Sequence, residues 1–369
     1  MKFLIAPNAF KGTIAADEAA EIIRMIIREQ LPNSEIIIQP IADGGDGTCA
    51  LLIDSLKLKS VSLLSLDPIG RPISSVIGWD PETRKAYFDV STASGIGILG
   101  EDQKQAHLTS TYGTGILIQK AIELGAEEIV LGLGGSATVD MGLGILQALG
   151  FVFLDQNGRE MVPFCPDFIK KIHHVQRPIR LPQIKFTLLC DVRNLFFGSD
   201  GAIPVFGPQK GLRSDQLEDF EFQCHRVLSL ILKKSKSVWE DREGFGAAGG
   251  IALGLSLFFH TEIKFGSNYF FEVVGLDEKV KQVDWIVTGE GRYDSQSNQG
   301  KACFELLQLA KSAGKKIALI TSGDEAKSAQ FDEVWKLPDL DFSKEGWKEK
   351  ARENLHRLVV DFTMGLSKS

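Results

Sequence analysis

The sequence has few of the features that mark secreted, zinc-binding or membrane-spanning proteins. Its 369 residues include only five cysteines, and no two of them form a Cys-x-x-Cys pair. An odd number of scattered thiols is typical of a reducing compartment and argues against a structural zinc site. The longest uncharged run, residues 244–261, is rich in glycine and falls short of the roughly 20 apolar residues of a membrane helix. We therefore expect a cytoplasmic protein without a membrane partner.

The sequence also lacks an excess of positive charge, because its 48 acidic residues outnumber its 41 basic residues. The formal net charge is −7, and no dense cluster of lysine and arginine occurs. Proteins that bind nucleic acids carry such clusters, so we expect no nucleic-acid partner. The consensus Gly-x-x-x-x-Gly-Lys-Ser/Thr is missing as well, which excludes a P-loop enzyme. A homodimer is compatible with this composition.

The order of apolar runs and glycine loops predicts an α/β protein of two domains. Both ends of the chain alternate strands and helices, with Thr13 and Thr48 expected as helix N-caps. The middle contains three short strands joined by turns rich in proline and glycine, which indicates an antiparallel meander. We expect residues 1–62 plus 275–369 to form a Rossmann-like domain with a parallel sheet. Residues 63–274 would form an inserted mixed α/β domain.

The stretch 128–150 is the strongest candidate for a phosphate-binding loop. An apolar run is followed by glycines and hydroxyl residues and then by a second apolar segment. Glycines let backbone N–H groups approach an anion closely, and a helix N-terminus adds a favourable field. The alternative is that the glycines serve only to turn the chain. The proposed phosphate contacts are Gly134, Gly135, Ser136, Ala137 and Thr138.

Charged and amide side chains follow several other predicted strands. In doubly wound sheets ligands bind beyond the carboxyl ends of the strands, so these loops are expected to converge. Phosphoryl transfer needs cations, Mg²⁺ and a carboxylate that takes the proton of the acceptor hydroxyl. The residues suited to these tasks are Lys11, Asp43, Asp191, Asn194, Glu290, Asp294 and Lys301.

Each of these residues also has a purely structural interpretation. Asp43 could accept backbone N–H bonds inside its loop, and Asn194 could be an ordinary turn residue. Asp140 could cap the helix that it precedes instead of touching a ligand. Lys11 could simply be solvated. Asp191, directly after an apolar strand, is the hardest to explain in this way.

Taken together, the loops resemble a known family. In chain order they read APNAFKGT, PIADGGDGT, GLGGSATVDMGLGILQALG, CDVRN, GFGAAGG and VTGEGRYDSQSNQGK. This order is similar to that of the first glycerate kinase family, the group that contains bacterial glycerate 2-kinases. The resemblance extends from residue 3 to about residue 323 and implies two α/β domains with the active site in the cleft between them.

The resemblance implies an ATP- and Mg²⁺-dependent transfer of the γ-phosphoryl group to D-glycerate, giving 2-phosphoglycerate. It implies Asp191 as the base, with Lys11 and Asp43 as further catalytic residues. Asp294 and Asp191 would hold the metal. The nucleotide would contact Gly134, Gly135, Ser136, Ala137, Thr138, Asn194, Glu290 and Lys301.

The sequence departs from the family pattern at some positions. Asn8 stands where an acidic residue is common, and Leu195 stands where a proline usually follows CDVRN. Asn8 removes a charge, and Leu195 loosens a turn beside Asp191, which could alter rate or regiochemistry. Three alternatives therefore stay open: another small hydroxy acid as substrate, 3-phosphoglycerate as product, or a nucleotide-binding regulator without activity.

Overall fold

The chain forms two compact units, each built around its own sheet. The computed structural model describes residues 1–10, 12–235, 239–293, 301–323 and 330–366. Residues 1–43 and 267–369 form unit 1, and residues 44–266 form unit 2. The sequence placed these transitions near 62 and 274. The structure differs because the helix after residue 47 packs on the strands of unit 2.

Unit 1 contains a parallel five-stranded sheet in the order β13-β12-β11-β1-β2. Its strands are β1 (Lys2–Ile5), β2 (Glu35–Ile38), β11 (Trp285–Gly289), β12 (Lys316–Thr321) and β13 (Glu333–Lys336). Its helices are α1 (Ala16–Gln30), α10 (Gly266–Val273), α11 (Leu276–Lys281), α12 (Ala302–Ser312) and α13 (Trp347–Leu366). The parallel sheet assembled from both chain ends confirms the α/β class.

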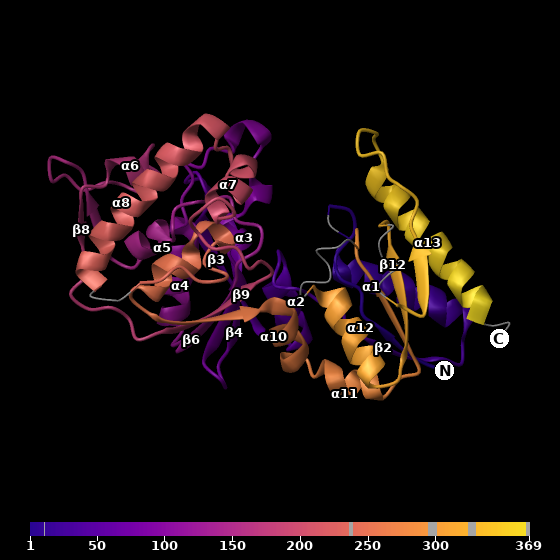
Figure 1. The fold of residues 1–369 in the computed structure, drawn as a ribbon. Helices are drawn as coiled ribbons and strands as arrows, with labels where there is room; N and C mark the ends of the chain where they lie inside the picture. Colours follow the sequence, from indigo (N-terminus) through magenta and orange to yellow (C-terminus); the bar gives the residue numbers. More distant parts are fainter. Residues whose placement is uncertain (11, 236–238, 294–300, 324–329, 367–369) are drawn as a thin grey trace. The chain divides into compact units, whose positions relative to one another are not determined.

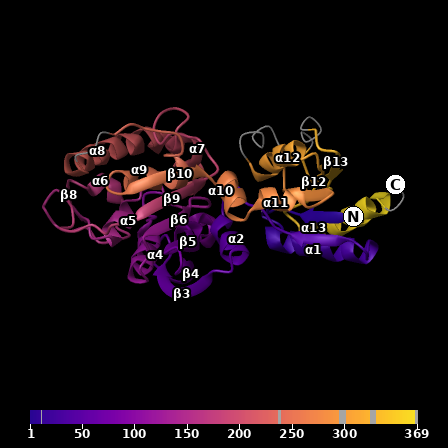
Figure 2. The same cartoon turned by 90° about the horizontal axis from the view of Figure 1, so that it is seen from below.

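Helices cover both faces of this sheet. Helices α1 and α13 pack together on one face, and α12 covers the other (Figure 1, Figure 2). Side chains at alternate positions of the strands point to the same face, so Phe3 and Ile5 join Ile23 and Leu355 in one buried cluster. This packing fixes the carboxyl ends of β1 and β11, where the candidate residues of unit 1 begin.

Unit 2 contains a mixed six-stranded sheet in the order β10-β9-β6-β5-β4-β3. The strands are β3 (Lys59–Leu66), β4 (Pro72–Asp80), β5 (Lys85–Asp89), β6 (Glu128–Gly132), β9 (Lys185–Cys190) and β10 (His260–Phe265), with a separate pair β7 (Val152–Leu154) and β8 (His174–Gln176). The α-helices are α2 (Thr48–Ser55), α3 (Ser91–Ser94), α4 (Tyr112–Glu123), α5 (Leu143–Ala148), α6 (Phe168–Lys171), α7 (Ala202–Phe206), α8 (Leu217–Ser235) and α9 (Ile251–Ser256). Short 3-10 turns are η1 (Ile96–Ile98), η2 (Glu101–Gln103), η3 (Pro208–Lys210), η4 (Ser214–Gln216) and η5 (Ala247–Gly249).

The sheet of unit 2 combines both kinds of pairing. Strands β3, β4 and β5 form the antiparallel meander that the turn residues predicted, whereas β5, β6, β9 and β10 run parallel. Gly132 at the end of β6 lies opposite both Asp89 of β5 and Leu189 of β9. The segments that leave these three strands therefore start side by side. None of the described helices is both long and apolar enough to cross a bilayer.

Both expected helix caps are wrong. Helix α1 begins after Ala15, and the Thr13 hydroxyl donates instead to the carbonyl of Phe10 at 2.7 Å. Helix α2 already includes Thr48, whose hydroxyl donates to the Gly45 carbonyl at 2.8 Å. In both cases the threonine stabilises the preceding loop. Its hydroxyl donates to a carbonyl of that loop instead of accepting from an N–H group of the helix.

Candidate active site

In unit 2 the loop after β6 is held by its neighbours through backbone hydrogen bonds. Leu133 N–H donates to Leu189 O, and Ala137 N–H donates to Ser94 O, both at 2.9 Å. Gly135 O accepts from Ile96 N–H at 2.8 Å. The N–H of Ala137 is thus already used, although Ala137 belongs to the proposed cradle.

The same loop still offers unused donors. Over the described part of unit 2, no acceptor is found for the N–H groups of Gly134, Gly135 and Ser136. Backbone N–H groups without an acceptor are uncommon, and consecutive ones form a concave anion-binding arrangement. The Thr138 hydroxyl, which is fully buried, also has no partner within the described residues. These groups give the β6 loop the chemistry of a phosphate site.

A second glycine loop packs directly against this one. A methyl group on Gly134 would collide with the backbone of Gly45 and Asp46. A methyl group on Gly44 would come within 2.6 Å of the carbonyl oxygen of Cys190. Glycine is therefore required at Gly134 and Gly44 by close backbone approach. These contacts bring the loops after β6 and β9 together with residues 44–47.

Asp89, at the end of β5, holds the start of helix α2. Its carboxylate accepts from the N–H groups of Cys49 at 3.1 Å and Ala50 at 3.3 Å. It thereby replaces the cap that Thr48 does not provide. Burial raises the pKa of Asp89 to about 7, and the nearby charge of Asp46 adds to this increase. The Asp46 carboxylate in turn accepts a hydrogen bond from the Ser91 hydroxyl.

Asp191 lies where the sequence predicted it, directly after β9. It is half-buried and follows Cys190, whose thiol pKa is raised to about 12 by burial and by the charge of Asp191. Asn194 lies three residues on, and its amide donates to the Asp200 carbonyl at 2.8 Å. The Asn194 amide thus shapes its own loop.

Asp140 connects two helices. Its carboxylate accepts from the N–H and hydroxyl of Thr111, before α4, and from the N–H groups of Gly142 and Gly144 at the start of α5. Burial raises the pKa of Asp140, although these hydrogen bonds partly oppose the increase. Of the two interpretations left open by the sequence, the capping role is the one that these contacts support.

Lys210 is a residue that sequence reasoning missed. It ends the short turn η3, its exposed fraction is only 4%, and its amine donates to Ser136 Oγ at 2.7 Å and to Thr138 O at 2.9 Å. Burial lowers the pKa of Lys210 to about 7, and the charge of Asp140 only partly offsets this effect. The only sequence signal was a lysine beside a glycine in a loop, and its partners lie more than 70 positions away.

The candidate residues of unit 1 converge on a cavity of about 840 Å³. The polar residues that line it include Asn8, Asp43, Glu290, Arg292, Tyr293 and Lys301. Asn8 donates through Nδ2 to Asp43 Oδ2 at 3.3 Å, so the amide that replaces a common acidic residue acts as a neutral partner of the carboxylate. Burial and the charge of Glu290 raise the pKa of Tyr293, which therefore stays protonated. Lys11 and Asp294 lie outside the described residues.

The donor set of this cavity fits Mg²⁺. Asp43 and Glu290 are almost fully buried carboxylates on the cavity wall. Among the described residues no group of three potential metal-binding side chains occurs. Mg²⁺ is usually held by one or two carboxylates, with phosphate oxygens and water completing its coordination. Asp43 and Glu290 therefore match what a magnesium–nucleotide complex needs from a protein.

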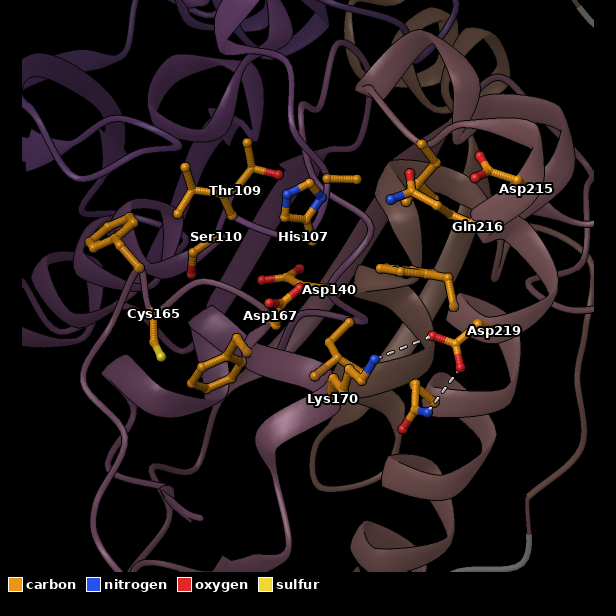
Figure 3. Close-up of a pocket in the computed structure, with 18 residues that line it drawn as sticks. His107, Thr109, Ser110, Asp140, Cys165, Asp167, Lys170, Asp215, Gln216 and Asp219 are labelled. Atoms are coloured by element: carbon orange, nitrogen blue, oxygen red, sulfur yellow. Dashed lines mark hydrogen bonds and ion pairs between the residues drawn. The ribbon is translucent and has the colours of Figure 1, made fainter. Parts of the chain in front are cut away.

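Unit 2 contains a smaller cavity of about 240 Å³. His107, Ser110, Asp140 and Asp167 are among its polar residues, and Lys170 forms an ion pair with Asp219 at 3.9 Å at its edge (Figure 3). None of the site residues expected from the sequence lines it. It is therefore distinct from the candidate site, apart from the capping residue Asp140.

Comparisons with known proteins give a consistent picture. A family model described as "Glycerate kinase family" matches residues 3–365. The chain is 33% identical to a glycerate kinase of Haemophilus influenzae over 98% of this chain and 99% of that protein. It is 36% identical to a glycerate kinase of Bacillus subtilis, covering 85% and 82% of the two chains. It is also 32% identical to the glycerate 2-kinase of Escherichia coli, with coverages of 86% and 84%.

A solved structure agrees with the sequence comparisons. The crystal structure described as glycerate kinase 2 from Salmonella typhimurium LT2 superposes with a TM-score of 0.83 at 28% identity. The match covers 100% of this chain and 98% of that chain. The chain thus belongs to the glycerate kinase family and is an enzyme of the kinase class that acts on small molecules.

Proposed function

We propose that the protein transfers the γ-phosphoryl group of ATP to D-glycerate and forms 2-phosphoglycerate. The observation that carries this proposal is the neighbourhood of the β6 loop and Asp191. Strands β6 and β9 are adjacent and parallel, with Gly132 opposite Leu189. The N–H groups of residues 134–136 and the carboxylate of Asp191 therefore leave the sheet at the same edge. Anion donors beside a carboxylate base are what phosphoryl transfer requires.

The chemistry assigned to Asp191 is that of a general base. As the glycerate hydroxyl oxygen forms a bond to the γ-phosphorus, the bond from that phosphorus to the bridging oxygen of ADP breaks. The hydroxyl proton passes to the Asp191 carboxylate, and the electron pair of the breaking bond leaves with ADP. The β6 loop binds the nucleotide phosphates through the N–H groups of Gly134, Gly135 and Ser136.

The residues of the unit 1 cavity are assigned to the metal and to charge neutralisation. Asp43 and Glu290 would hold Mg²⁺, which supplies positive charge to the phosphate oxygens. Asp294 keeps the metal role, and Lys11 the catalytic role, that the family resemblance implies. Lys301, on the cavity wall, adds a cation for phosphate oxygens.

A panel of acceptors tests the substrate assignment. Purified protein with ATP and Mg²⁺ is assayed for ADP release with D-glycerate, L-glycerate, lactate, glycolate and tartrate. We expect the highest kcat/KM with D-glycerate. A higher kcat/KM with another hydroxy acid would identify that acid as the substrate instead of D-glycerate. If no acceptor increased ADP release, a nucleotide-binding regulator without activity would be favoured.

A further inference from the structure

We infer that Lys210 is the buried cation of the phosphate loop, and that its amine takes up a proton when nucleotide phosphate binds. This inference rests on the proposed function in one respect, because it takes the ligand of the β6 loop to be a nucleotide. Lys210 acts through Ser136 and the loop backbone and is therefore a positioning residue.

The hydrogen-bond directions support this role. Once Lys210 is protonated its ammonium group has no lone pair and can only donate, so the Ser136 oxygen, 2.7 Å away, must accept from it. The hydroxyl proton of Ser136 is then directed away from Lys210 and can be donated to an anion. The second bond, to Thr138 O at 2.9 Å, ties the amine to the other end of the same loop. Lys210 thus determines both the shape of the loop and the orientation of its hydroxyl donor.

The burial of Lys210 explains why a ligand should change its protonation. A desolvated ammonium is unfavourable without an anionic partner. This accounts for a lysine pKa that is lowered to about 7. An anion placed on the β6 loop would supply the missing negative charge and raise the pKa again. At pH 8 binding would therefore draw about one proton from solution.

Other charged groups near the loop must be distinguished from Lys210. Asp140 is the charge that acts on the Lys210 amine, and the Cys224 thiol of α8 is influenced by the same carboxylate. On the other side of the loop Asp46 lies against Gly135, and Asp89 lies against Gly132. The backbone of Lys104, whose side chain pairs with Glu101, lies beside Gly211.

Two of these groups could contribute to proton uptake. Asp89 has a pKa of about 7, and an anion nearby would raise the pKa of its carboxyl group as well. Asp140 responds in the same direction. The variant Asp89→Asn therefore serves as a separate arm of the test, because it removes the second group that titrates close to pH 7.

The test is calorimetric titration of the full chain with Mg²⁺ and ATP at pH 8, without glycerate, in buffers of different ionisation enthalpy. We expect the wild type to take up about one proton, and Lys210→Met to lose most of this uptake and to bind ATP at least tenfold more weakly. Lys120→Met removes an exposed lysine of α4 that pairs with Glu123, and it should behave as wild type. Ser136→Ala should weaken ATP binding several-fold but retain the uptake.

The thermal midpoint separates this role from a purely structural one. We expect Lys210→Met to melt at the same temperature as wild type or higher, because a desolvated amine is removed. No uptake by the wild type, uptake that persists in folded Lys210→Met, or uptake that vanishes in Asp89→Asn would overturn the inference. The first and third outcomes are measurable even if Lys210→Met fails to fold. Glycerate turnover by the wild type is measured separately, so failure of the proposed substrate remains distinguishable.

Discussion

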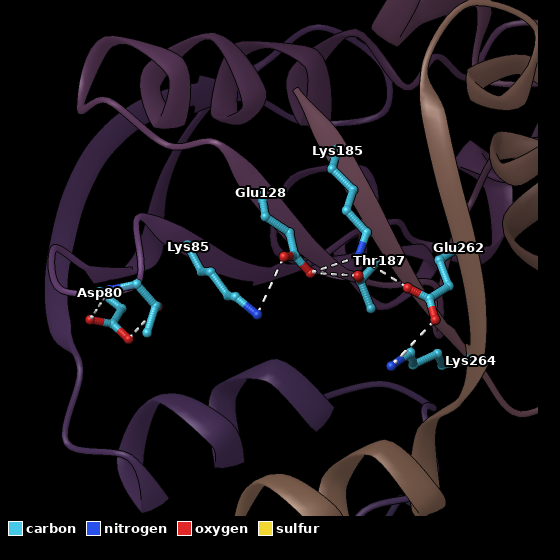
Figure 4. Close-up of polar contacts among 8 residues, drawn as sticks. Asp80, Lys85, Glu128, Lys185, Thr187, Glu262 and Lys264 are labelled. Carbon is cyan, nitrogen blue, oxygen red and sulfur yellow. Dashed lines mark hydrogen bonds and ion pairs between the residues drawn. The ribbon is translucent and has the colours of Figure 1, made fainter. Parts of the chain in front are cut away.

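The two ends of the unit 2 sheet are built from the same strands but carry opposite kinds of polar chemistry. Where β5, β6 and β9 begin, Lys85, Glu128 and Lys185 lie opposite one another and form ion pairs. This charge ladder continues to Glu262 and Lys264 on β10 (Figure 4). Its charges alternate, so each has an opposite neighbour, and water can reach most of them.

At the other end of these strands the polar groups are buried. The pKa values of two carboxyl groups show the contrast. In the ladder, burial would raise the pKa of Glu128, but the Thr187 hydroxyl, Lys85 and Lys185 together hold the pKa below its ordinary value. Asp89 lies on the strand next to β6, and its pKa is raised to about 7 because burial dominates. Perturbed groups of this kind are common at functional sites and reduce stability there. The comparison teaches that charges are compensated at one end of the sheet and left perturbed at the other, which is the end where we propose that ligand binds.

The largest effect should come from Asp191→Asn, which removes the proposed base. We expect kcat to fall by about two orders of magnitude or more, with ATP affinity changed only slightly. Steady-state kinetics and nucleotide titration measure the two quantities. Asp155→Asn, in a turn of the same unit, is the matched control and should leave kcat unchanged. Near-normal turnover of Asp191→Asn would remove that residue from the mechanism.

Gly134→Ala should have the next largest effect, because its methyl group has no space. The loop must move away from Gly45 and Asp46, so we expect ATP affinity to fall on the order of tenfold and stability by about 1–3 kcal/mol. Denaturant unfolding and nucleotide titration provide the measurements. Gly97→Ala adds the same methyl group where nothing lies within 4 Å. Equal behaviour of the two variants would show that close packing of the loops is unimportant.

Asp89→Asn should change how stability depends on pH. The pKa of this carboxyl is about 7 in the folded protein, against an ordinary value of 3.8. The folded state therefore binds the proton more tightly, and the free energy of unfolding falls as pH rises between these values. The loss attributable to Asp89 is on the order of 4 kcal/mol.

Urea unfolding of wild type and Asp89→Asn at pH 4, 5, 6 and 8 measures this contribution. We expect the variant to lose less stability than wild type across that range. Parallel curves for the two proteins would contradict the assignment of a raised pKa to Asp89.

The smallest effect should come from Glu128→Gln in the charge ladder. Ion pairs that water reaches contribute little, so we expect a loss of about 1 kcal/mol and unchanged kcat. The loss should shrink in high salt because mobile ions screen the pairs. Glu127→Gln, beside it on the surface and paired with Arg84, is expected to cost even less. A clear loss of kcat in Glu128→Gln would break the contrast between the two ends of the sheet.

Sequence patterns predicted the parts of the structure that depend on local order. Apolar runs gave the parallel strands, and the loops after β6 and β9 begin where glycines and Asp191 indicated. The roles of Asp89 and Lys210 depend instead on residues that are distant in the sequence. Asp89 caps a helix that begins about 40 positions earlier, and nothing in its own surroundings signals that contact. The expected cap at Thr48 failed for a related reason, since the distant carboxylate of Asp89 holds the start of α2.

The identity of the product tests the central claim most directly. Purified full-length protein is incubated with D-glycerate, ATP and Mg²⁺, and the mixture is followed by ³¹P NMR. The account predicts a new phosphomonoester resonance that coincides with added 2-phosphoglycerate and grows as the γ-phosphate signal of ATP declines. A resonance that coincides with 3-phosphoglycerate would contradict the proposed regiochemistry, and no glycerate-dependent resonance would contradict the proposed activity.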